Sequence, residues 1–197
     1  MNRGENETAN AVHDAESLAA GASRGDSDAF DRLVLMYKDK IYNLCYRFLG
    51  VHAEAEDAAQ DVFMKVYTSI NQFKFQASFS TWLYRIAVNT CKNRLKSYTW
   101  RNFFSFKAGI TDEELPEITD SRPLPDMQME KAQLTRAVEK AIAALPVAQR
   151  LVVVLRDIEG LSYEEISTIT GFNPGTVKSK ISRARQALRD KLQGVVG

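Results

Sequence analysis

Cysteine and histidine are scarce in this chain, with two residues of each among 197. No Cys-x-x-Cys pair and no Cys/His cluster occurs, which argues against a structural zinc site. We interpret Cys45 and Cys91 as small buried apolar residues with reduced thiols, although the sequence leaves a redox role open. The histidines, His13 and His52, fall in a predicted tail and a loop, so neither is expected to act in catalysis.

Long apolar runs are absent as well. The longest purely aliphatic run covers residues 151–155, which is far too short to cross a bilayer, and the N-terminus is acidic and polar, unlike a signal peptide. We therefore expect a cytoplasmic protein without membrane insertion. The sequence also lacks a nucleotide-binding glycine loop, a metal cluster and a nucleophile–base pair, so we expect no enzyme activity, no cofactor and no metal.

A net charge of +1 hides an uneven distribution of charge. Residues 1–31 carry seven acidic and two basic side chains, residues 85–107 carry six basic and no acidic ones, and residues 110–130 carry seven acidic and one basic. The near-zero average therefore conceals basic blocks between acidic ones.

The strongest motif lies near the C-terminus and predicts two short helices joined by a tight turn. Ser162 and Glu165 form a capping box that starts the first helix, and Gly171 can end it in the left-handed conformation. Asn173 then caps a second helix, with Pro174 at its first position, where the missing N–H costs nothing. This order is typical of a helix-turn-helix.

The second helix of this motif has an apolar side and a polar, basic side. Val177, Ile181, Ala184 and Leu188 share the core-facing stripe. Short polar side chains lie opposite, with cations at both edges, which favours a helix in a DNA major groove over a solvated basic surface helix. The candidate DNA-contacting residues are Lys178, Ser179, Lys180, Ser182, Arg183 and Arg185.

Helical periodicity extends over most of the remaining chain. A short helix is predicted to begin near Ala15, and longer helices are predicted over 28–49, 53–70 and 80–96, the last capped by Ser80. Helices over 127–145 and 146–157 precede the helix-turn-helix, which completes a four-helix module. We therefore predict an all-α protein of two small helical domains joined by a flexible linker.

The linker is predicted from an acidic, proline-containing stretch without an apolar period. The predicted parts are a disordered tail over 1–14, a first domain over 15–96, the linker over 97–127 and a second domain over 128–194.

Aromatic residues gather in two places that could meet nucleic acid. Phe73, Phe75 and Phe79 lie in a polar loop before the third long helix, where they either fold into the core or form stacking platforms for bases. Rings and cations also alternate over 98–107, which suits single-stranded nucleic acid because charge meets the backbone and rings meet the bases. A core patch with a basic surface explains the second cluster equally well.

Six segments of the chain resemble a bacterial sigma factor of the extracytoplasmic-function group. The segments in the first domain are 28–37 (DAFDRLVLMY), 56–67 (EDAAQDVFMKVY) and 79–89 (FSTWLYRIAVN). Those in the second domain are 144–150 (ALPVAQR), 157–166 (DIEGLSYEEI) and 175–185 (GTVKSKISRAR). Many regulators share a helix-turn-helix, but this combination, in this order and in a chain this short, is specific.

The resemblance implies a sigma-two domain that recognises and melts the −10 promoter element and a sigma-four domain that binds the −35 element. The −10 recognition residues implied are Phe73, Phe75, Trp82, Arg85 and Asn89. The residues implied in core polymerase binding are Asp57, Gln60, Asp61 and Phe63. The implied partners are core RNA polymerase, through its β′ clamp helices and β flap, promoter DNA and an anti-sigma factor, and the linker would run through the polymerase channel.

Two other functions compete with this interpretation. A helix-turn-helix repressor or activator with an N-terminal sensing or dimerisation domain predicts tight duplex binding by the isolated protein. The sigma interpretation predicts weak binding alone, and it requires two separable domains and an uncovered arginine-bearing face on the last helix. A nucleic-acid enzyme would need a carboxylate or histidine constellation, which the sequence does not show.

Overall fold

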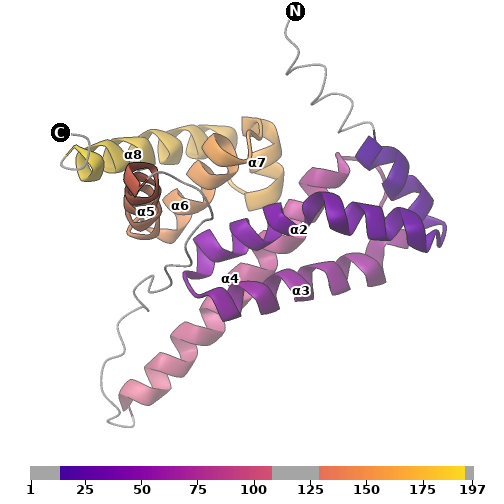
Figure 1. Ribbon diagram of the computed structural model, residues 1–197, viewed down its shortest axis with the longest axis horizontal. Coiled ribbons are helices and arrows are strands. Elements are labelled where there is room, and N and C mark those ends of the chain that lie inside the picture. The colour runs from indigo at the N-terminus through magenta and orange to yellow at the C-terminus, as the bar shows by residue number, and fades with distance from the viewer. Residues whose placement is uncertain (1–13, 108–128, 194–197) are drawn as a thin grey trace, which may run out of the picture.

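The computed structural model describes residues 14–107 and 129–193, with side chains described except over 96–107 and 129–132. Every regular element in these ranges is helical, so the predicted all-α class is confirmed. The helices form two groups, the first drawn in indigo to pink and the second in orange to yellow (Figure 1).

The first domain consists of four helices and one short 3-10 turn. They are residues 14–23, α2 (Ser27–Leu49), α3 (His52–Ser69), the turn η1 (Ile70–Gln72) and α4 (Phe79–Lys107). Asp26 caps α2 by accepting a hydrogen bond from the backbone N–H of Ala29 at 3.0 Å. Gly50 ends α2 with a φ of 77°, a left-handed conformation that glycine adopts without steric cost.

The core of the first domain lies where α2, α3 and α4 meet. Leu33, Ile41, Val62 and Leu83 are each no more than 1% exposed. Burying a side chain of this size stabilises the fold by about 1.5–3 kcal/mol. Cys45 and Cys91, both fully buried, also lie in this core with free thiols, so the prediction of small buried residues is confirmed.

Helix α4 differs from its prediction at both ends. Ser78, rather than Ser80, caps the helix, because its hydroxyl accepts a hydrogen bond from the backbone N–H of Thr81 at 3.2 Å. The helix runs to Lys107 instead of ending near residue 96, so the predicted domain boundary falls inside it. The physical reason is that no glycine or proline interrupts the sequence before Gly109. Residues 108–127 of the predicted linker and residues 1–13 of the predicted tail lie outside the described residues.

The second domain follows its prediction closely. It contains α5 (Met129–Ala143), α6 (Val147–Val153), a π-helical turn η2 (Val154–Ile158), α7 (Tyr163–Thr170) and α8 (Pro174–Leu192). Pro146 separates α5 from α6. Leu151, Leu155, Ile166 and Ile181 are each no more than 2% exposed and form its core.

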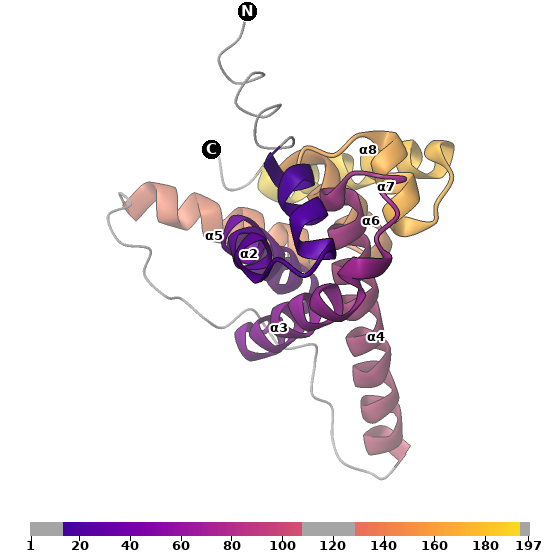
Figure 2. The same cartoon turned by 90° about the vertical axis from the view of Figure 1, so that its right-hand side faces the viewer.

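The two domains are in contact. Helix α4 packs against α7, and the C-terminal part of α2 lies near α5 and α6 (Figures 1 and 2). Arg150 of α6 connects the domains there, since its Nη1 donates to the carbonyl oxygen of Phe48 at 3.0 Å. The sequence did not predict this docked arrangement.

Candidate nucleic-acid interfaces

The helix-turn-helix forms as its capping residues predict. The Ser162 hydroxyl accepts from the Glu165 backbone N–H at 3.1 Å, and the Glu165 carboxylate accepts from the Ser162 N–H at 2.8 Å. Gly171 ends α7 with a φ of 76°. The Asn173 side chain accepts from the Thr176 N–H at 2.7 Å and starts α8 at Pro174. Local hydrogen bonding therefore sets the angle at which α8 leaves the turn.

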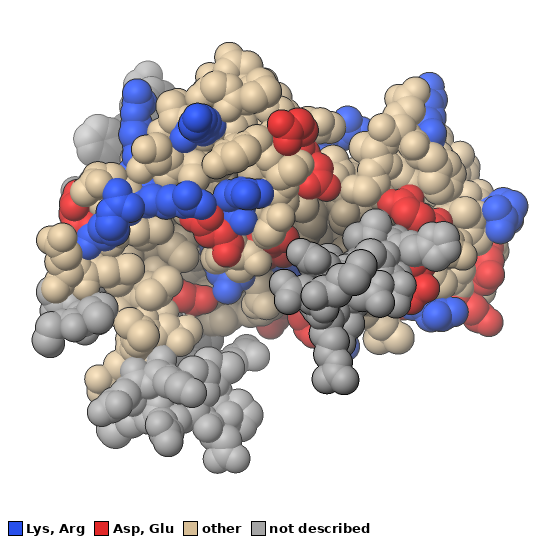
Figure 3. Space-filling model, turned by 90° about the horizontal axis from the view of Figure 1, so that it is seen from above, with Lys and Arg blue, Asp and Glu red and all other residues tan. Residues whose placement is uncertain are grey.

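The two sides of α8 differ as the sequence predicts. Val177, Ile181 and Ala184 are at most 2% exposed and hold the helix on its domain. Lys178, Ser179, Ser182 and Arg183 are exposed on the outer side. Figure 3 shows Lys and Arg side chains gathered on the side of the molecule that α8 occupies. In the part of the chain that the structure describes, nothing covers the face of Arg183.

Two of the predicted DNA-contacting cations have partners within the second domain. Arg185 pairs with Asp157 through two contacts, Nε to Oδ2 at 3.0 Å and Nη2 to Oδ1 at 2.5 Å, and this hydrogen bonding raises the pKa of Arg185. Lys180 is half-buried, with its Nζ 5.2 Å from the centre of the Phe172 ring. These contacts make Arg185 and Lys180 part of the support of α8.

The loop before α4 divides its aromatic rings between core and surface. Phe73 is only 7% exposed, and its ring centre lies 5.0 Å from that of Trp82, with 33° between the ring planes. Phe79 is buried in the core. Phe75 is 48% exposed, lies 4.5 Å from the Phe73 ring and has a φ of 54°, which is unusual for a bulky residue. Backbone strain of this kind is concentrated at functional sites.

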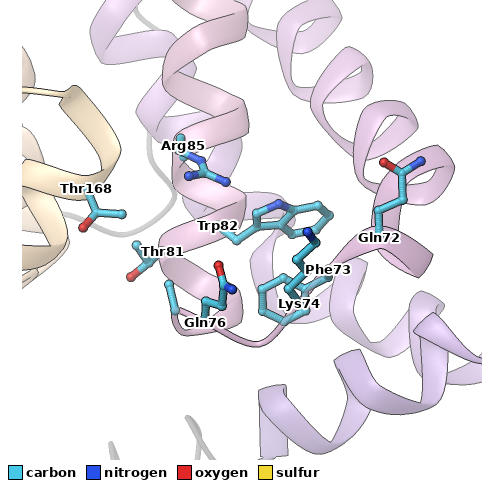
Figure 4. Close-up of a pocket in the computed structure, with 9 residues that line it drawn as sticks. Gln72, Phe73, Lys74, Gln76, Thr81, Trp82, Arg85 and Thr168 are labelled. Carbon is cyan, nitrogen blue, oxygen red and sulfur yellow. The ribbon is translucent and has the colours of Figure 1, made fainter.

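A cavity of about 410 Å³ opens beside these rings (Figure 4). Phe73 and Trp82 contribute aromatic surface, and Lys74 and Arg85 contribute positive charge. The remaining lining residues are Gln72, Gln76, Ala77, Thr81 and Thr168. Rings, cations and amides together suit an unpaired nucleotide, whose base can stack and hydrogen-bond while its phosphate meets a cation.

The structure brings most of the predicted −10 residues to this cavity. Phe73, Trp82 and Arg85 line it, and Phe75 lies beside it. Asn89 is exposed one turn further along α4, on the same side as Arg85. Gln72, Lys74 and Gln76 were not among the predicted −10 recognition residues, although they lie in the same aromatic loop. The side chains of the second aromatic and basic cluster, over 98–107, lie outside those described.

The outer face of α3 carries the residues predicted to bind core polymerase, with one exception. Asp57, Gln60 and Asp61 are exposed. Phe63 is half-buried and packs against the core, so it supports the helix from inside. Met64 and Tyr67, which are 60% and 62% exposed, extend the face instead. Met64 and Tyr67 lie four and seven residues after Gln60. This helical spacing could have predicted that they share the outer face of α3.

Asp61 also has a role within the first domain. Arg94 of α4 contacts Asp61 at 2.5 Å and Glu54 at 3.0 Å, which raises the pKa of Arg94. These two ion pairs connect α3 to α4 beside the exposed outer face of α3. Asp57 and Gln60 therefore present their side chains on a helix with a fixed orientation.

Metal-binding and membrane-spanning features were searched within the described ranges. No group of three or more His, Cys, Asp and Glu side chains there could hold a metal ion. His52 instead meets the Tyr42 hydroxyl through its Nδ1 at 2.5 Å. None of the helices in those ranges combines the length and apolarity needed to cross a membrane.

Comparison with known proteins matches both domains. Residues 33–101 match the model of Sigma-70 region 2, and residues 135–188 match that of Sigma-70, region 4. The ECF RNA polymerase sigma factor SigW of Bacillus subtilis (strain 168) is 40% identical over 172 residues, covering 86% of this chain and 92% of the relative. The chain belongs to the ECF RNA polymerase sigma factors.

Other relatives and solved structures agree with this sigma-factor assignment. The ECF RNA polymerase sigma-E factor of Escherichia coli (strain K12) is 36% identical over 185 residues, covering 91% of this chain and 94% of the relative. The sigma factor RpoE of Bartonella quintana, solved with the anti-sigma factor NepR, aligns with a TM-score of 0.65 and 25% identity over 83% of this chain and 96% of that one. CnrH, solved with the cytosolic domain of CnrY, shares the fold with a TM-score of 0.67 and 23% identity over 92% of this chain and 98% of that one.

The match to Sigma-70 region 2 decides between the two regulator hypotheses. It covers the domain that a repressor or activator would use for sensing or dimerisation. The aromatic cavity and the exposed face of α3 also lie in that domain.

Proposed function

We propose that this sigma factor binds core RNA polymerase through the outer face of α3 and reads a promoter with two separate surfaces. The exposed face of α8 binds the −35 element, and the cavity between the Phe73 loop and α4 holds an unstacked base of the −10 element. One observation carries the proposal: an exposed, basic helix of a helix-turn-helix lies in one domain, and a cavity lined by Phe73 and Trp82 lies beside α4 in the other.

Energetic considerations favour a cavity that holds one base outside the DNA duplex. A duplex hides its bases, so melting must extrude one at a cost of about a few kcal/mol. Stacking of a base on an aromatic side chain returns roughly 1–3 kcal/mol. Phe73 and Trp82 form a preformed stacking surface, so one or two stacked bases offset the cost without chemistry. This function requires no hydrolysis and no cofactor.

The cations and amides around the rings have separate tasks in this proposal. Lys74 and Arg85 meet the phosphates, which positions the strand without reading its sequence. Gln72 and Gln76 present amide donors and acceptors to base edges. Asn89 reads an adjacent base from the next turn of α4.

Core binding places Asp57, Gln60, Met64 and Tyr67 against the β′ clamp helices. Met64 and Tyr67 supply exposed apolar area, and the acidic and amide groups supply polar contacts around it. The second domain would reach the β flap, and the stretch between the domains would pass through the polymerase channel. These assignments make the protein a cytoplasmic one that acts within a larger complex and carries out no catalysis itself.

We also infer an anti-sigma factor as a regulatory partner, since the RpoE relative was solved in complex with one. An inhibitor that covers the polymerase-binding surfaces excludes polymerase. Binding of the inhibitor and of core polymerase should therefore be mutually exclusive in a competition experiment.

Transcription in vitro tests the proposal. Purified core polymerase, this chain and a promoter library should yield transcripts with defined start sites, while the isolated chain binds the same duplexes weakly. Absence of a start-site-specific transcript from every template would defeat the proposal. Tight, specific duplex binding by the isolated chain would favour the repressor or activator alternative.

A further inference from the structure

A carboxylate from the N-terminal helix (residues 14–23) reaches the start of α4. Glu16 of that helix accepts, through its Oε1, a hydrogen bond from the backbone N–H of Phe79 at 2.6 Å. The two residues are 63 positions apart in the sequence. Phe79 is the first residue of α4, where a backbone N–H has no acceptor within its own helix. Glu16 therefore satisfies a donor that the helix leaves open.

The chemistry of this contact suits the end of a helix. The N-terminal end of a helix carries partial positive charge, which favours a carboxylate beside it. Ser78 supplies a second acceptor there, since its hydroxyl accepts from the backbone N–H of Thr81. Hydrogen bonds to ionised acceptors are also stronger than those between neutral groups. The start of α4 is thus held by one acceptor from its own loop and one from a distant helix.

The N-terminal helix holds Glu16 in a fixed place. The apolar side of this helix packs into the core of the first domain, and its members are at most 8% exposed: Ala15, Leu18, Ala19 and Ala22. The charge of Glu16 also acts on Tyr37 of α2, because burial and then this carboxylate raise the pKa of the Tyr37 hydroxyl. The Tyr37 ring meets the Phe79 ring edge to face, with ring centres 5.7 Å apart.

Phe79 connects this contact to the candidate −10 cavity. Its ring is 1% exposed, and its centre lies 6.0 Å from the centres of both the Phe73 and the Trp82 rings. Phe73 and Trp82 are the two rings that line the cavity (Figure 4). Protein interiors are close-packed, so a displacement of Phe79 is transmitted to both rings. Glu16 does not line the cavity itself and acts on it through Phe79.

The loop between Phe73 and Phe79 increases the need for an anchor. Phe75 within it has a φ of 54°, a conformation that a bulky residue keeps only when its surroundings enforce it. The Phe75 ring lies 4.5 Å from that of Phe73, so the strained residue is part of the same aromatic cluster. The contact between Glu16 and the Phe79 N–H fixes the end of this loop that joins α4.

We propose that Glu16 is a positioning residue for promoter melting: by holding the backbone of Phe79, it keeps the Phe73 and Trp82 rings in the arrangement that stacks an extruded base. The proposal rests on the function proposed above for the cavity. It gives a role to the N-terminal helix, which precedes the residues that match the model of Sigma-70 region 2. A stacking surface that is already in place loses less conformational freedom when the base binds.

Transcription by the holoenzyme on templates that lack single bases tests the proposal. The template is a promoter recovered from the library experiment above, and each position of its non-template −10 strand is made abasic in turn. The rate of open-complex formation is measured for the unaltered chain, Glu16→Ala and Glu16→Gln. The control is Asp14→Asn, which removes an exposed carboxylate of the same helix.

On the intact promoter, Glu16→Ala should slow open-complex formation roughly threefold to thirtyfold, the range expected for loss of a helix-capping acceptor. Glu16→Gln should retain most of the rate, because its amide oxygen still accepts from the Phe79 N–H. Asp14→Asn should match the unaltered chain. On the template that lacks the captured base, Glu16→Ala and the unaltered chain should become equal, because the two changes remove the same interaction.

An equal loss for Glu16→Ala on every template, abasic or intact, would overturn the proposal, since Glu16 would then support only the fold. An unchanged rate for Glu16→Ala on the intact promoter would also overturn it. Should Glu16→Ala fail to fold, the same ratios are measured for Glu16→Asp, which keeps the charge and shortens the side chain by one methylene.

Fluorescence of Trp82 gives a second readout that needs no promoter. The chain has two tryptophans, so Trp100→Phe leaves Trp82 as the sole indole emitter. In that background, Glu16→Ala should shift the emission of Trp82 and increase its quenching by acrylamide, whereas Glu16→Gln should do so less. Unchanged emission and quenching in Glu16→Ala would overturn the positioning role. Failure of the unaltered chain to transcribe would instead defeat the proposed function, and the fluorescence result would still test the contact.

Discussion

Arg183 and Arg185 lie two residues apart on α8, yet their side chains have different surroundings. Arg183 is exposed on the outer face, whereas Arg185 forms two contacts with Asp157. We predict that Arg183→Ala weakens −35 binding by the holoenzyme by about 1–3 kcal/mol if its guanidinium meets a base. Arg185→Ala removes the same charge and should cost less. Equal losses in a binding assay on duplexes with altered −35 elements would show that the recognition face is misassigned.

The two cysteines make a second prediction at the level of single residues. The Cys91 thiol lies 3.6 Å from the Cys45 sulfur, and this contact together with burial raises the pKa of Cys91 above its ordinary value of 9.0. The folded chain therefore keeps this proton at pH values where the unfolded chain loses it. The stabilisation is complete below pH 9 and declines as the pH rises further.

At pH 8 the native Cys91 thiol should react with iodoacetamide at least about tenfold more slowly than the same thiol in the unfolded chain, since each unit of raised pKa lowers the thiolate fraction about tenfold. Titration with and without denaturant measures this ratio. Rapid alkylation of the native protein, or a disulfide after mild peroxide treatment, would revive the redox role that the sequence left open.

Among the elements, α3 presents an outer face that combines acidic, amide and apolar groups. We predict that Met64→Ala lowers affinity for core polymerase by more than about 1 kcal/mol, because it removes a large exposed apolar contact near the centre of this face. The matched control is Leu35→Ala on α2, where the side chain is 64% exposed. Competition for purified core polymerase measures both. Equal affinity of the two variants would move the polymerase contact away from α3.

Helix α7 is short, so its capping box matters to the second domain. Ser162→Ala should lower the free energy of unfolding by about 0.5–2 kcal/mol, because the Glu165 N–H loses its acceptor. Ser182→Ala, on the exposed face of α8, should leave stability nearly unchanged. Urea unfolding followed by circular dichroism compares the two. Indistinguishable midpoints would mean that tertiary packing alone sets the start of α7.

The elements also show what a sequence can and cannot predict. Capping groups act over three or four residues, so Ser162, Gly171 and Asn173 were assigned correctly from local pattern alone. Helix α4 was predicted too short because a change in composition near residue 97 resembled a linker, although no residue there breaks a helix. A change in composition alone therefore does not show where a helix ends.

Contacts between residues that are far apart in the sequence could not be predicted from local sequence patterns. Asp157 and Arg185 are 28 residues apart in the sequence. The sequence pattern therefore could not show that Arg185 is paired with a carboxylate whereas Arg183 is exposed. The resemblance implied a polymerase contact for Phe63, but Phe63 packs against the core, and the neighbouring Met64 is the exposed residue. The contacts of Tyr84 and Thr81 with the second domain depend on how the two domains dock, which no local rule specifies.

At the scale of the whole molecule, the two domains read two DNA elements whose separation the chain alone does not set. In this structure they lie together. Hydrogen bonds join α4 to Glu159 and to α7, and Arg150 of α6 donates to the carbonyl oxygen of Phe48 near the end of α2. A rigid duplex requires the reading surfaces to be held at a defined distance. We therefore expect polymerase to separate the domains and set the promoter spacing.

Transcription by core polymerase and this chain, on templates that differ only in the length of the spacer between the −35 and −10 elements, tests that claim directly. The account predicts a single optimum, with start-site-specific transcription falling steeply when the spacer is lengthened or shortened by a few base pairs. Transcription that is indifferent to spacer length would contradict it, because the two domains would then not be reading both elements at once.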